Sequence, residues 1–245
     1  MIIKVKMIEI TVTDTKTFSK AIDTLSQFVQ IAYFKINEDN ITVFAIDESM
    51  ISASLIVFKC VEIKGFEDIT GFSVHLKPLV SIFKCVNTTE FTLLFNDNDD
   101  TITLKFDEDV YIVSLAYADP FDDIEFEKDE FFFELKINSA DFKKHIGNIL
   151  GDVIKFNFNK SVITMESKID LIQQKISINN HSEYICDKPI EMYFSIGPIY
   201  KILKNLLSET LEIARRSSKD AMIFTYKNDS MVYEFFLADR EITDE

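Results

Sequence analysis

The chain has 245 residues, of which 47% are hydrophobic, and its 41 acidic and 26 basic residues give a formal net charge of -15. The hydrophobic content is ample for a packed core, and no apolar run reaches the roughly 18 residues that a membrane-spanning helix needs. The charge has the wrong sign for an ordinary nucleic-acid-binding domain, so DNA binding would require basic residues gathered on one surface of an otherwise acidic protein.

A helix is the first predicted element, because apolar side chains recur along one of its faces. Phe18, Ile22, Leu25 and Val29 stand at the spacing of helical turns, and Asp14 ahead of them is a suitable N-cap. Strands rich in β-branched and aromatic residues are predicted next, at residues 33–36, 41–45 and 52–57.

A second helix is predicted around Pro78, which stands in its first turn, where the missing N–H costs least. Its apolar stripe consists of Leu79, Ile82, Phe83 and Val86. Three further strands are predicted at residues 91–96, 101–106 and 110–116. The segment that follows, residues 117–130, is rich in Asp and Glu and is predicted to be an exposed linker.

The same order of patterns recurs about 120 residues later, which indicates an internal duplication. Phe142, Ile146 and Ile149 repeat the first stripe, with Ser139 as the expected N-cap, and Pro198 repeats the proline of the second helix. The matching strands are predicted at residues 153–158, 162–166, 173–178, 210–215, 221–227 and 231–238. We therefore expect an α+β fold with two similar domains, each with two helices packed on an antiparallel sheet, at residues 1–116 and 131–245 and joined by linker 117–130.

Lysines lie beside the apolar stripe of all four predicted helices. They are Lys16, Lys20, Lys77, Lys84, Lys143, Lys144, Lys201 and Lys204. Solvated helices ordinarily carry lysines, so an acidic α+β protein of another kind, including an enzyme, is the alternative. Four such helices on one side of a sheet would instead form a basic surface, and without a cluster of Arg, Asn or Gln that surface suits sequence-independent phosphate contact.

Other chemistry finds little support in the sequence. The three cysteines, Cys60, Cys85 and Cys186, are scattered, which favours reduced thiols in an intracellular protein over a disulfide frame or a zinc site. His75, His145 and His181 are isolated, and no P-loop, GxGxxG, HExxH or GxSxG motif occurs. We predict no catalytic residue, no metal and no cofactor.

Three segments resemble the proliferating cell nuclear antigen (PCNA) family of DNA sliding clamps. They are Ile46–Ile51, the helical stretch Ile82–Cys85, and Lys204–Glu245 with its Phe235-Phe236-Leu237-Ala238 ending and acidic tail. The resemblance covers nearly the whole chain in order. It implies the DNA clamp fold in a ring, usually of three subunits, homomeric or heteromeric, whose helices line a hole that encircles duplex DNA. It also implies a processivity factor rather than an enzyme, with no membrane association.

The resemblance also implies sites. The eight helix lysines would face the DNA channel, with Lys16, Lys20, Lys84, Lys144 and Lys204 the closest matches by position. DNA polymerase, clamp loader, nuclease or ligase would bind through short hydrophobic peptides in a pocket formed by Ile46, Ile51, Ile124, Phe126, Ala221, Phe236 and Ala238. Adjacent subunits would pair strands 110–116 and 173–178 through Val110, Ile112, Ser114, Lys175 and Ser177. Core packing is the alternative for Ile46, Ile51 and Phe236.

Three single residues and one pair depart from the family pattern: Ser81, Gly147, Ala221 and the pair Asp239-Arg240. They suit a divergent member, such as a subunit of a heteromeric archaeal ring, a viral clamp or a checkpoint-type clamp. A clamp-fold scaffold in checkpoint signalling or viral transcription, without a processivity function, is the second functional hypothesis. The expected location is the nucleus in a eukaryote, the cytoplasm in an archaeon, or the replication site of a virus.

Overall fold

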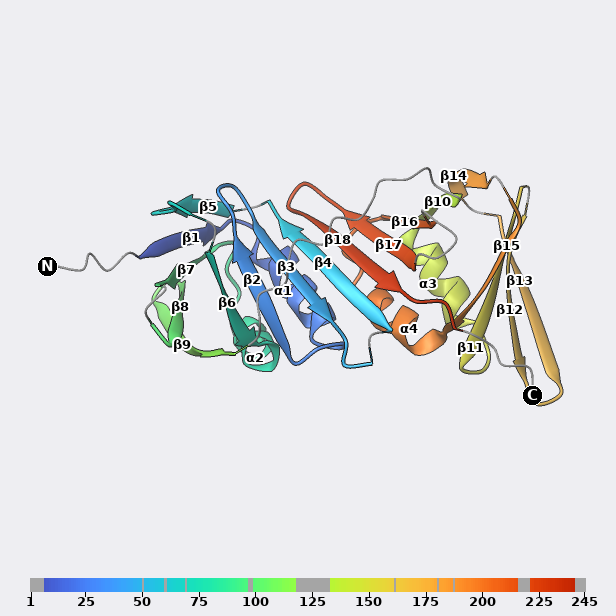
Figure 1. Cartoon of the computed structure of the whole chain (residues 1–245), viewed down its shortest axis with the longest axis horizontal. Coiled ribbons are helices and arrows are strands. Elements are labelled where there is room, and N and C mark those ends of the chain that lie inside the picture. Colours follow the sequence, from blue (N-terminus) through green and yellow to red (C-terminus); the bar gives the residue numbers. More distant parts are fainter. Residues whose placement is uncertain are drawn as a thin grey trace, which may run out of the picture. The chain divides into compact units, whose positions relative to one another are not determined.

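The structure is a computed structural model that describes most of the chain (Figure 1). The described residues are 7–49, 51–59, 61–68, 70–96, 99–117, 133–160, 162–179, 181–186, 188–215 and 221–240. They form two compact units. Unit 1 consists of Met1–Glu48, Ser54–Ile124 and Asn228–Tyr233, and unit 2 of Ser49–Ala53, Glu125–Lys227 and Glu234–Glu245. The predicted linker falls almost wholly outside the described residues, since only Tyr117 of it is described.

Unit 1 is built on antiparallel strands with two helices. In chain order its elements are β1 (Ile8–Val12), α1 (Thr15–Leu25), β2 (Ile31–Ile36), β3 (Ile41–Ile46), β4 (Ser52–Phe58), β5 (Val61–Lys64), β6 (Thr70–His75), α2 (Leu76–Cys85), β7 (Phe91–Phe95), β8 (Thr101–Phe106) and β9 (Asp109–Ala116). The strand order across the sheet is β4-β3-β2-β6-β9-β8-β7-β1-β5. The β6–β9 junction is short, with Ser73 opposite Ala116 and Val74 opposite Leu115.

Unit 2 repeats that plan. Its elements are β10 (Phe133–Asn138), α3 (Ser139–Gly147), β11 (Val153–Asn159), β12 (Val162–Ile169), β13 (Ile172–Ile178), β14 (His181–Cys186), β15 (Ile190–Ser195), α4 (Ile196–Lys204), β16 (Thr210–Arg215), β17 (Met222–Lys227) and β18 (Met231–Leu237). The strands are ordered β13-β12-β11-β15 in one sheet and β14-β10-β16-β17-β18 in the other. The division between the units falls within β4 and within β18, so each of these strands has residues in both units.

The duplication extends to single hydrogen bonds. The order β4-β3-β2-β6 in unit 1 matches β13-β12-β11-β15 in unit 2, and β9-β8-β7-β1-β5 matches β18-β17-β16-β10-β14. In unit 1 the N–H of Thr15, the first residue of α1, donates to the Thr89 carbonyl at 3.0 Å. In unit 2 the N–H of Ser139, the first residue of α3, donates in the same way to the Glu209 carbonyl at 2.8 Å. The predicted α+β fold of two similar domains, each with two helices on antiparallel sheet, is therefore confirmed.

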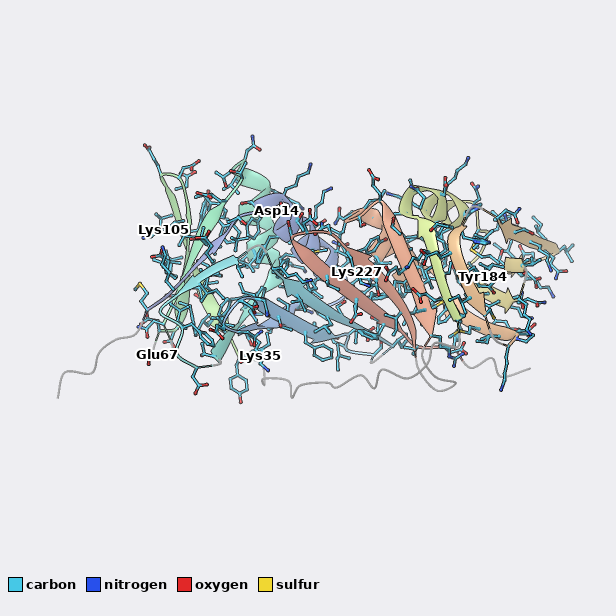
Figure 2. All side chains as sticks on the ribbon, turned by 90° about the horizontal axis from the view of Figure 1, so that it is seen from above. Asp14, Lys35, Glu67, Lys105, Tyr184 and Lys227 are labelled. Carbon is cyan, nitrogen blue, oxygen red and sulfur yellow. The ribbon has the colours of Figure 1, made fainter. Side chains whose placement is uncertain are left out.

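The helices form because most residues of their predicted apolar stripes are buried in the core, although Ile82 on α2 is only half-buried. Phe18 on α1 is 2% exposed and its ring centre lies 4.4 Å from that of Phe58 and 5.2 Å from that of Phe91. Phe142 on α3 holds the matching position in unit 2 and is wholly buried. Figures 1 and 2 show both helices of unit 1 on one side of its strands; in Figure 2, Asp14 marks that side and Lys35 on β2 the opposite one. In each unit, the helix faces that point away from the sheet are therefore not covered by that sheet.

Three expectations about local structure need correction. The N-cap of α3 is Asn138, whose side-chain oxygen accepts from the N–H of Ala140 at 3.0 Å and of Asp141 at 3.1 Å. Ser139 is instead the first residue of the helix; its backbone N–H donates to the Glu209 carbonyl and its side chain is buried. Helices α1, α2 and α3 end at Leu25, Cys85 and Gly147, so the predicted stripe residues Val29, Val86 and Ile149 lie beyond their helices. Strands β1, β5, β6, β10, β14 and β15 were not predicted from the sequence.

Candidate functional site

The lysines of α1 lie on the part of the helix that faces away from the unit 1 core. Lys16 is exposed and Lys20 is half-buried. The helix begins at Asp14, whose Oδ1 accepts from the N–H of Thr17 at 3.0 Å and whose Oδ2 accepts from the Ser230 hydroxyl at 2.6 Å. Partial burial raises the pKa of Asp14, but the hydrogen bonds from Ser230 and Thr17 outweigh it and hold the pKa below its ordinary value. The start of the helix therefore carries a negative charge.

Helix α2 contributes Lys77 and Lys84, and both are exposed. The Lys84 Nζ lies 3.9 Å from the Asp23 Oδ1 on α1. The Lys84 side chain is 71% exposed, so solvent screens this pair and it contributes little to stability. Its effect is instead on the surface potential, because the carboxylate offsets one of the lysines of this helix pair.

Helices α3 and α4 hold the remaining lysines and are linked by two reciprocal hydrogen bonds. Lys143, Lys144, Lys201 and Lys204 are all exposed. The Lys143 Nζ donates to the carbonyl oxygen of Lys204, the last residue of α4, at 3.4 Å. In return, the Tyr200 hydroxyl on α4 donates to the carbonyl oxygen of Ile146 in the last turn of α3, at 2.9 Å. Each helix thus satisfies a terminal carbonyl of the other.

Tyr200 is a residue that sequence reasoning missed. It is 40% exposed, and its hydroxyl donates to the Ile146 carbonyl at 2.9 Å. The signal was present in the sequence, because Gly197, Tyr200, Lys201 and Lys204 stand at the spacing of one helical face.

The expected partner pocket is only partly described. Ile51 is 48% exposed, and its carbonyl oxygen accepts from the Ala238 N–H at 2.9 Å, so these two expected residues adjoin within unit 2. Ile46, at the end of β3 in unit 1, is 37% exposed. Phe236 is 6% exposed and Ala221 is half-buried before β17. Ile124 and Phe126 lie outside the described residues.

Each of the two strands expected to pair between subunits has backbone groups exposed at a sheet edge. On β9, Val110 is 56% and Ile112 71% exposed, and Ser114 is exposed. Within the described chain β9 pairs with β6 only from Leu115 onward, so its earlier residues have β8 on one side alone.

Strand β13 is the edge of its four-stranded sheet and exposes Lys175 and Ser177. The Lys175 Nζ lies 2.6 Å from the Glu166 Oε1, and this hydrogen bond lowers the pKa of the Glu166 carboxyl.

Asp239 and Arg240 lie along a further sheet edge, that of β15. The Asp239 Oδ1 accepts from the Tyr193 N–H on β15 at 2.8 Å, and the Arg240 N–H donates to the Tyr193 carbonyl at 2.7 Å. This pairing places Asp239 and Arg240 along β15 within unit 2.

The described ranges contain neither a cluster of metal-binding side chains nor a membrane-spanning helix. No group of three or more His, Cys, Asp or Glu side chains there is placed to hold a metal ion. None of the helices in that part of the chain is long and apolar enough to cross a membrane.

Comparison with known proteins gives a family match in both halves of the chain. The sequence model described as "Proliferating cell nuclear antigen, N-terminal domain" matches residues 7–129 and again residues 132–242. The chain is also similar to "Proliferating cell nuclear antigen" of Saccharomyces cerevisiae (strain ATCC 204508 / S288c). The two are 25% identical over 256 residues, which cover 95% of this chain and 97% of the yeast protein.

Proposed function

We propose that this chain, which belongs to the proliferating cell nuclear antigen family of DNA sliding clamps, is a ring subunit that encircles duplex DNA and tethers DNA polymerase and other replication or repair enzymes. The observation that supports this most is the double match of one family domain across the chain, together with the repeated strand order. In this role the chain is a non-enzymatic processivity factor that acts where DNA is copied inside the cell.

The proposed DNA contact is made by the helix lysines, Lys16, Lys20, Lys77, Lys84, Lys143, Lys144, Lys201 and Lys204. Seven are exposed and Lys20 is half-buried, which suits contact with phosphates through solvent-screened charges. Such charges act only over about 8–10 Å at physiological salt. The resulting affinity is weak, salt-sensitive and independent of base sequence, so that encirclement holds the DNA and the subunit slides.

The proposed partner site comprises Ile46, Ile51, Ile124, Phe126, Ala221, Phe236 and Ala238, and takes short hydrophobic peptides from polymerase, clamp loader, nuclease or ligase. The exposure of Ile46 and Ile51 supports it, since exposed aliphatic side chains suit an aromatic anchor. The buried Phe236 would act as the floor of such a site.

The proposed assembly is a homomeric or heteromeric trimer in which β9 of one subunit pairs with β13 of the next. Two different edges meeting head to tail generate a closed ring if the rotation closes. The exposed Val110 and Ile112 and the exposed edge of β13 support this arrangement, because unpaired edges with apolar side chains favour strand addition.

The decisive experiment is loading onto circular DNA. We expect the chain, alone or with related subunits, to sediment as a ring, to remain on closed circles, to leave the DNA once it is linearised, and to increase the product length of a polymerase. Sedimentation as a monomer under every condition would contradict ring assembly. A ring that stays on circles without affecting any polymerase would favour the scaffold role in checkpoint signalling or viral transcription.

A further inference from the structure

The four-stranded sheet of unit 2 is hollowed on the face that points away from its core. Its strands lie in the order β13-β12-β11-β15 (Figure 1), and successive side chains of each strand alternate between the two faces. Ile154 and Phe156 on β11 are buried in the core, so Lys155 between them points to the opposite face. On that face lies a hollow of about 220 Å³, whose lining includes Val153, Lys155, Glu166, Lys168, Gln173 and Tyr193. A space of this size takes one large side chain rather than a drug-sized molecule.

The corresponding place in unit 1 is filled by an aromatic ring. Tyr33 and Lys155 are each the third residue of equivalent strands, β2 and β11, and Gly71 and Glu191 are each the second residue of β6 and β15. The Tyr33 ring lies against Gly71, since a Cβ added at that glycine would come within 2.6 Å of the Tyr33 Cζ. In unit 2 the Glu191 Oε2 lies instead 2.9 Å from the Lys155 Nζ. The two units therefore differ here, and the hollow belongs to unit 2.

Most charges around the hollow are already paired. The Lys155 Nζ is held by Glu191 and lies 5.5 Å from the centre of the Tyr193 ring. The Glu166 carboxylate is held by Lys175 at 2.6 Å. These pairs largely cancel in charge, and they fix the Lys155 stem and the Tyr193 ring as apolar walls of the hollow.

Lys168 and Gln173 supply the remaining polar groups at the hairpin end of the hollow. They face each other across β12 and β13, and both are exposed. In the part of the chain that the structure describes, the Lys168 ammonium has neither an ion pair nor a hydrogen bond. An unpaired cation beside an amide, on a chain with a net charge of -15, favours a ligand that brings a carboxylate.

The end of the β12–β13 hairpin, next to this lysine, is apolar and exposed. Ile169 ends β12 and is 41% exposed, Ile172 begins β13 and is 55% exposed, and Leu171 in the turn is fully exposed. Hairpin turns ordinarily consist of Gly, Asn or Asp, and only Asp170, with a φ of 49°, follows that rule here. Adjacent aliphatic side chains that face solvent are typical of surfaces that bind another protein.

We propose that this face of unit 2 binds a short peptide segment of a partner protein, with an acidic residue between two apolar ones. The peptide-binding face consists of Val153, Lys155, Lys168, Leu171, Gln173 and Tyr193. Alternate side chains of an extended peptide lie on one side, about 7 Å apart. The first apolar side chain fills the hollow against Tyr193, the carboxylate meets Lys168, and the second apolar side chain contacts Leu171.

A peptide suits this face better than a small carboxylic acid, which would fill the hollow and leave the hairpin end exposed. Every residue of the peptide-binding face belongs to unit 2. The inference therefore does not depend on DNA contact, on ring assembly, or on the proposed partner site that includes Ile46 and Ile51.

The test uses a fluorescein-labelled peptide of seven residues, with phenylalanine, glutamate and leucine at its second, fourth and sixth positions and serine elsewhere. Its binding to the full chain is measured by fluorescence anisotropy. Leu171→Ser should weaken binding about tenfold, because it removes the apolar contact at the hairpin end. Lys168→Ala should weaken binding about twofold to fivefold. A probe with glutamine in place of glutamate should lose no further affinity for Lys168→Ala, because both changes remove the same ion pair.

Matched controls come from the other end of β12. Val162→Ser removes a side chain that is 45% exposed, and Lys160→Ala removes an exposed lysine; neither should change the affinity. Ile51→Ser alters the proposed partner site and should also leave the affinity unchanged. Since Leu171 and Lys168 are exposed, their variants should melt at the temperature of the wild type.

Four results would overturn the inference. They are absence of probe binding, a loss with Val162→Ser as large as that with Leu171→Ser, an equal loss with Ile51→Ser, and binding that appears only after residues 241–245 are removed. The third result would place the probe at the proposed partner site, and the fourth would make the chain's own segment the occupant. None of the four bears on ring assembly or DNA contact, which the loading experiment tests separately.

Discussion

Replacement of Asp14 by Ala offers a quantitative test of the structure, because the duplication provides a matched control. Asp14 caps α1 through Thr17 and also accepts from the Ser230 hydroxyl at 2.6 Å, a contact between residues 216 positions apart in the chain. The neighbouring Ser230 carbonyl accepts from the Lys59 N–H at 2.8 Å, so this turn is tied to both α1 and the end of β4. At the matching position of unit 2, Asn138 caps α3 through two backbone N–H groups.

The expected magnitudes follow from what each substitution removes. Loss of an N-cap costs about 1 kcal/mol of stability, within a range of about 0.5–2. A hydrogen bond to a charged group contributes about 1.5–3 kcal/mol. Asp14→Ala should therefore lower the free energy of unfolding by about 2–4 kcal/mol, and Asn138→Ala by about 1. Asp14→Asn, which keeps a capping oxygen but loses the charge, should fall between wild type and Asp14→Ala.

Urea denaturation followed by far-UV circular dichroism would measure these differences, with the midpoint shifting and the slope unchanged if only stability is affected. The pKa of Asp14 is lowered in the folded state, so its contribution is present above the ordinary value of 3.8 and is lost as the pH falls through the folded pKa. The gap between wild type and Asp14→Asn should accordingly close in acid. A cost for Asn138→Ala equal to or above that for Asp14→Ala would refute the reasoning.

Three further predictions concern the core of unit 2, the exposed edge of β9, and the exposed glycine in the first turn of α4. Phe142→Ala should cost about 3–5 kcal/mol, because it empties a wholly buried ring position, and a chemical denaturation midpoint near that of wild type would contradict it. Ile112→Asp, at a side chain that is 71% exposed, should leave the melting temperature almost unchanged but reduce the sedimenting mass to that of a monomer; a persistent ring would argue against β9 as an assembly edge. Gly197→Ala should stabilise the chain by about 0.5–1 kcal/mol, visible as a higher melting temperature, and a lower one would show that the position is not open.

The helices were predictable from sequence because their signals are local. The stripe of Phe18, Ile22 and Leu25 is buried as expected, and Asp14 is the N-cap that its position predicted. The α3 cap was assigned one residue too late because Asn and Ser are both good caps. The two side-chain hydrogen bonds that Asn138 accepts from Ala140 and Asp141, and the burial of the Ser139 side chain, distinguish them. Burial depends on how the helix packs, which a local pattern does not reveal.

Three of the six strands that were not predicted illustrate two physical reasons. Strand β1 alternates buried and half-buried residues, and its sequence Ile-Glu-Ile-Thr-Val shows the matching alternation of apolar and polar residues. This strand was therefore predictable from the sequence. Strand β5 alternates apolar and charged residues but is only four residues long and buries none of them, and β14 exposes most of its residues. Both lie at sheet edges, where the apolar signal is weak. Their pairing partners β1 and β10 define them, and that information is not local.

The sequence predicts which residue types occupy the candidate site and that most of the lysines are exposed, but it does not predict which residues they contact. A lysine beside an apolar stripe is bound to be exposed, and seven of the eight are. The sequence gives no indication that Lys84 lies 3.9 Å from Asp23, or that Lys143 and Tyr200 bond across two helices, because each contact depends on how separate elements pack. Phe236 shows the same limit: it and Phe235 are both buried although they are adjacent on one strand, so alternation does not tell a pocket wall from core.

The net charge of -15, which first argued against DNA, becomes consistent with it once the lysines are sorted by element. Several lysines on strands are closely paired with carboxylates, such as Lys136 with Glu183 at 2.6 Å and Lys227 with Glu212 at 2.7 Å. The corresponding helix pair, Lys84 and Asp23, is much longer at 3.9 Å. Excess acid on the remaining surface repels DNA within a Debye length, and this leaves the helix faces as the places where a duplex is tolerated. Weak attraction at the helix faces of each unit and repulsion elsewhere is the charge distribution that a subunit needs if it is to surround DNA and move along it.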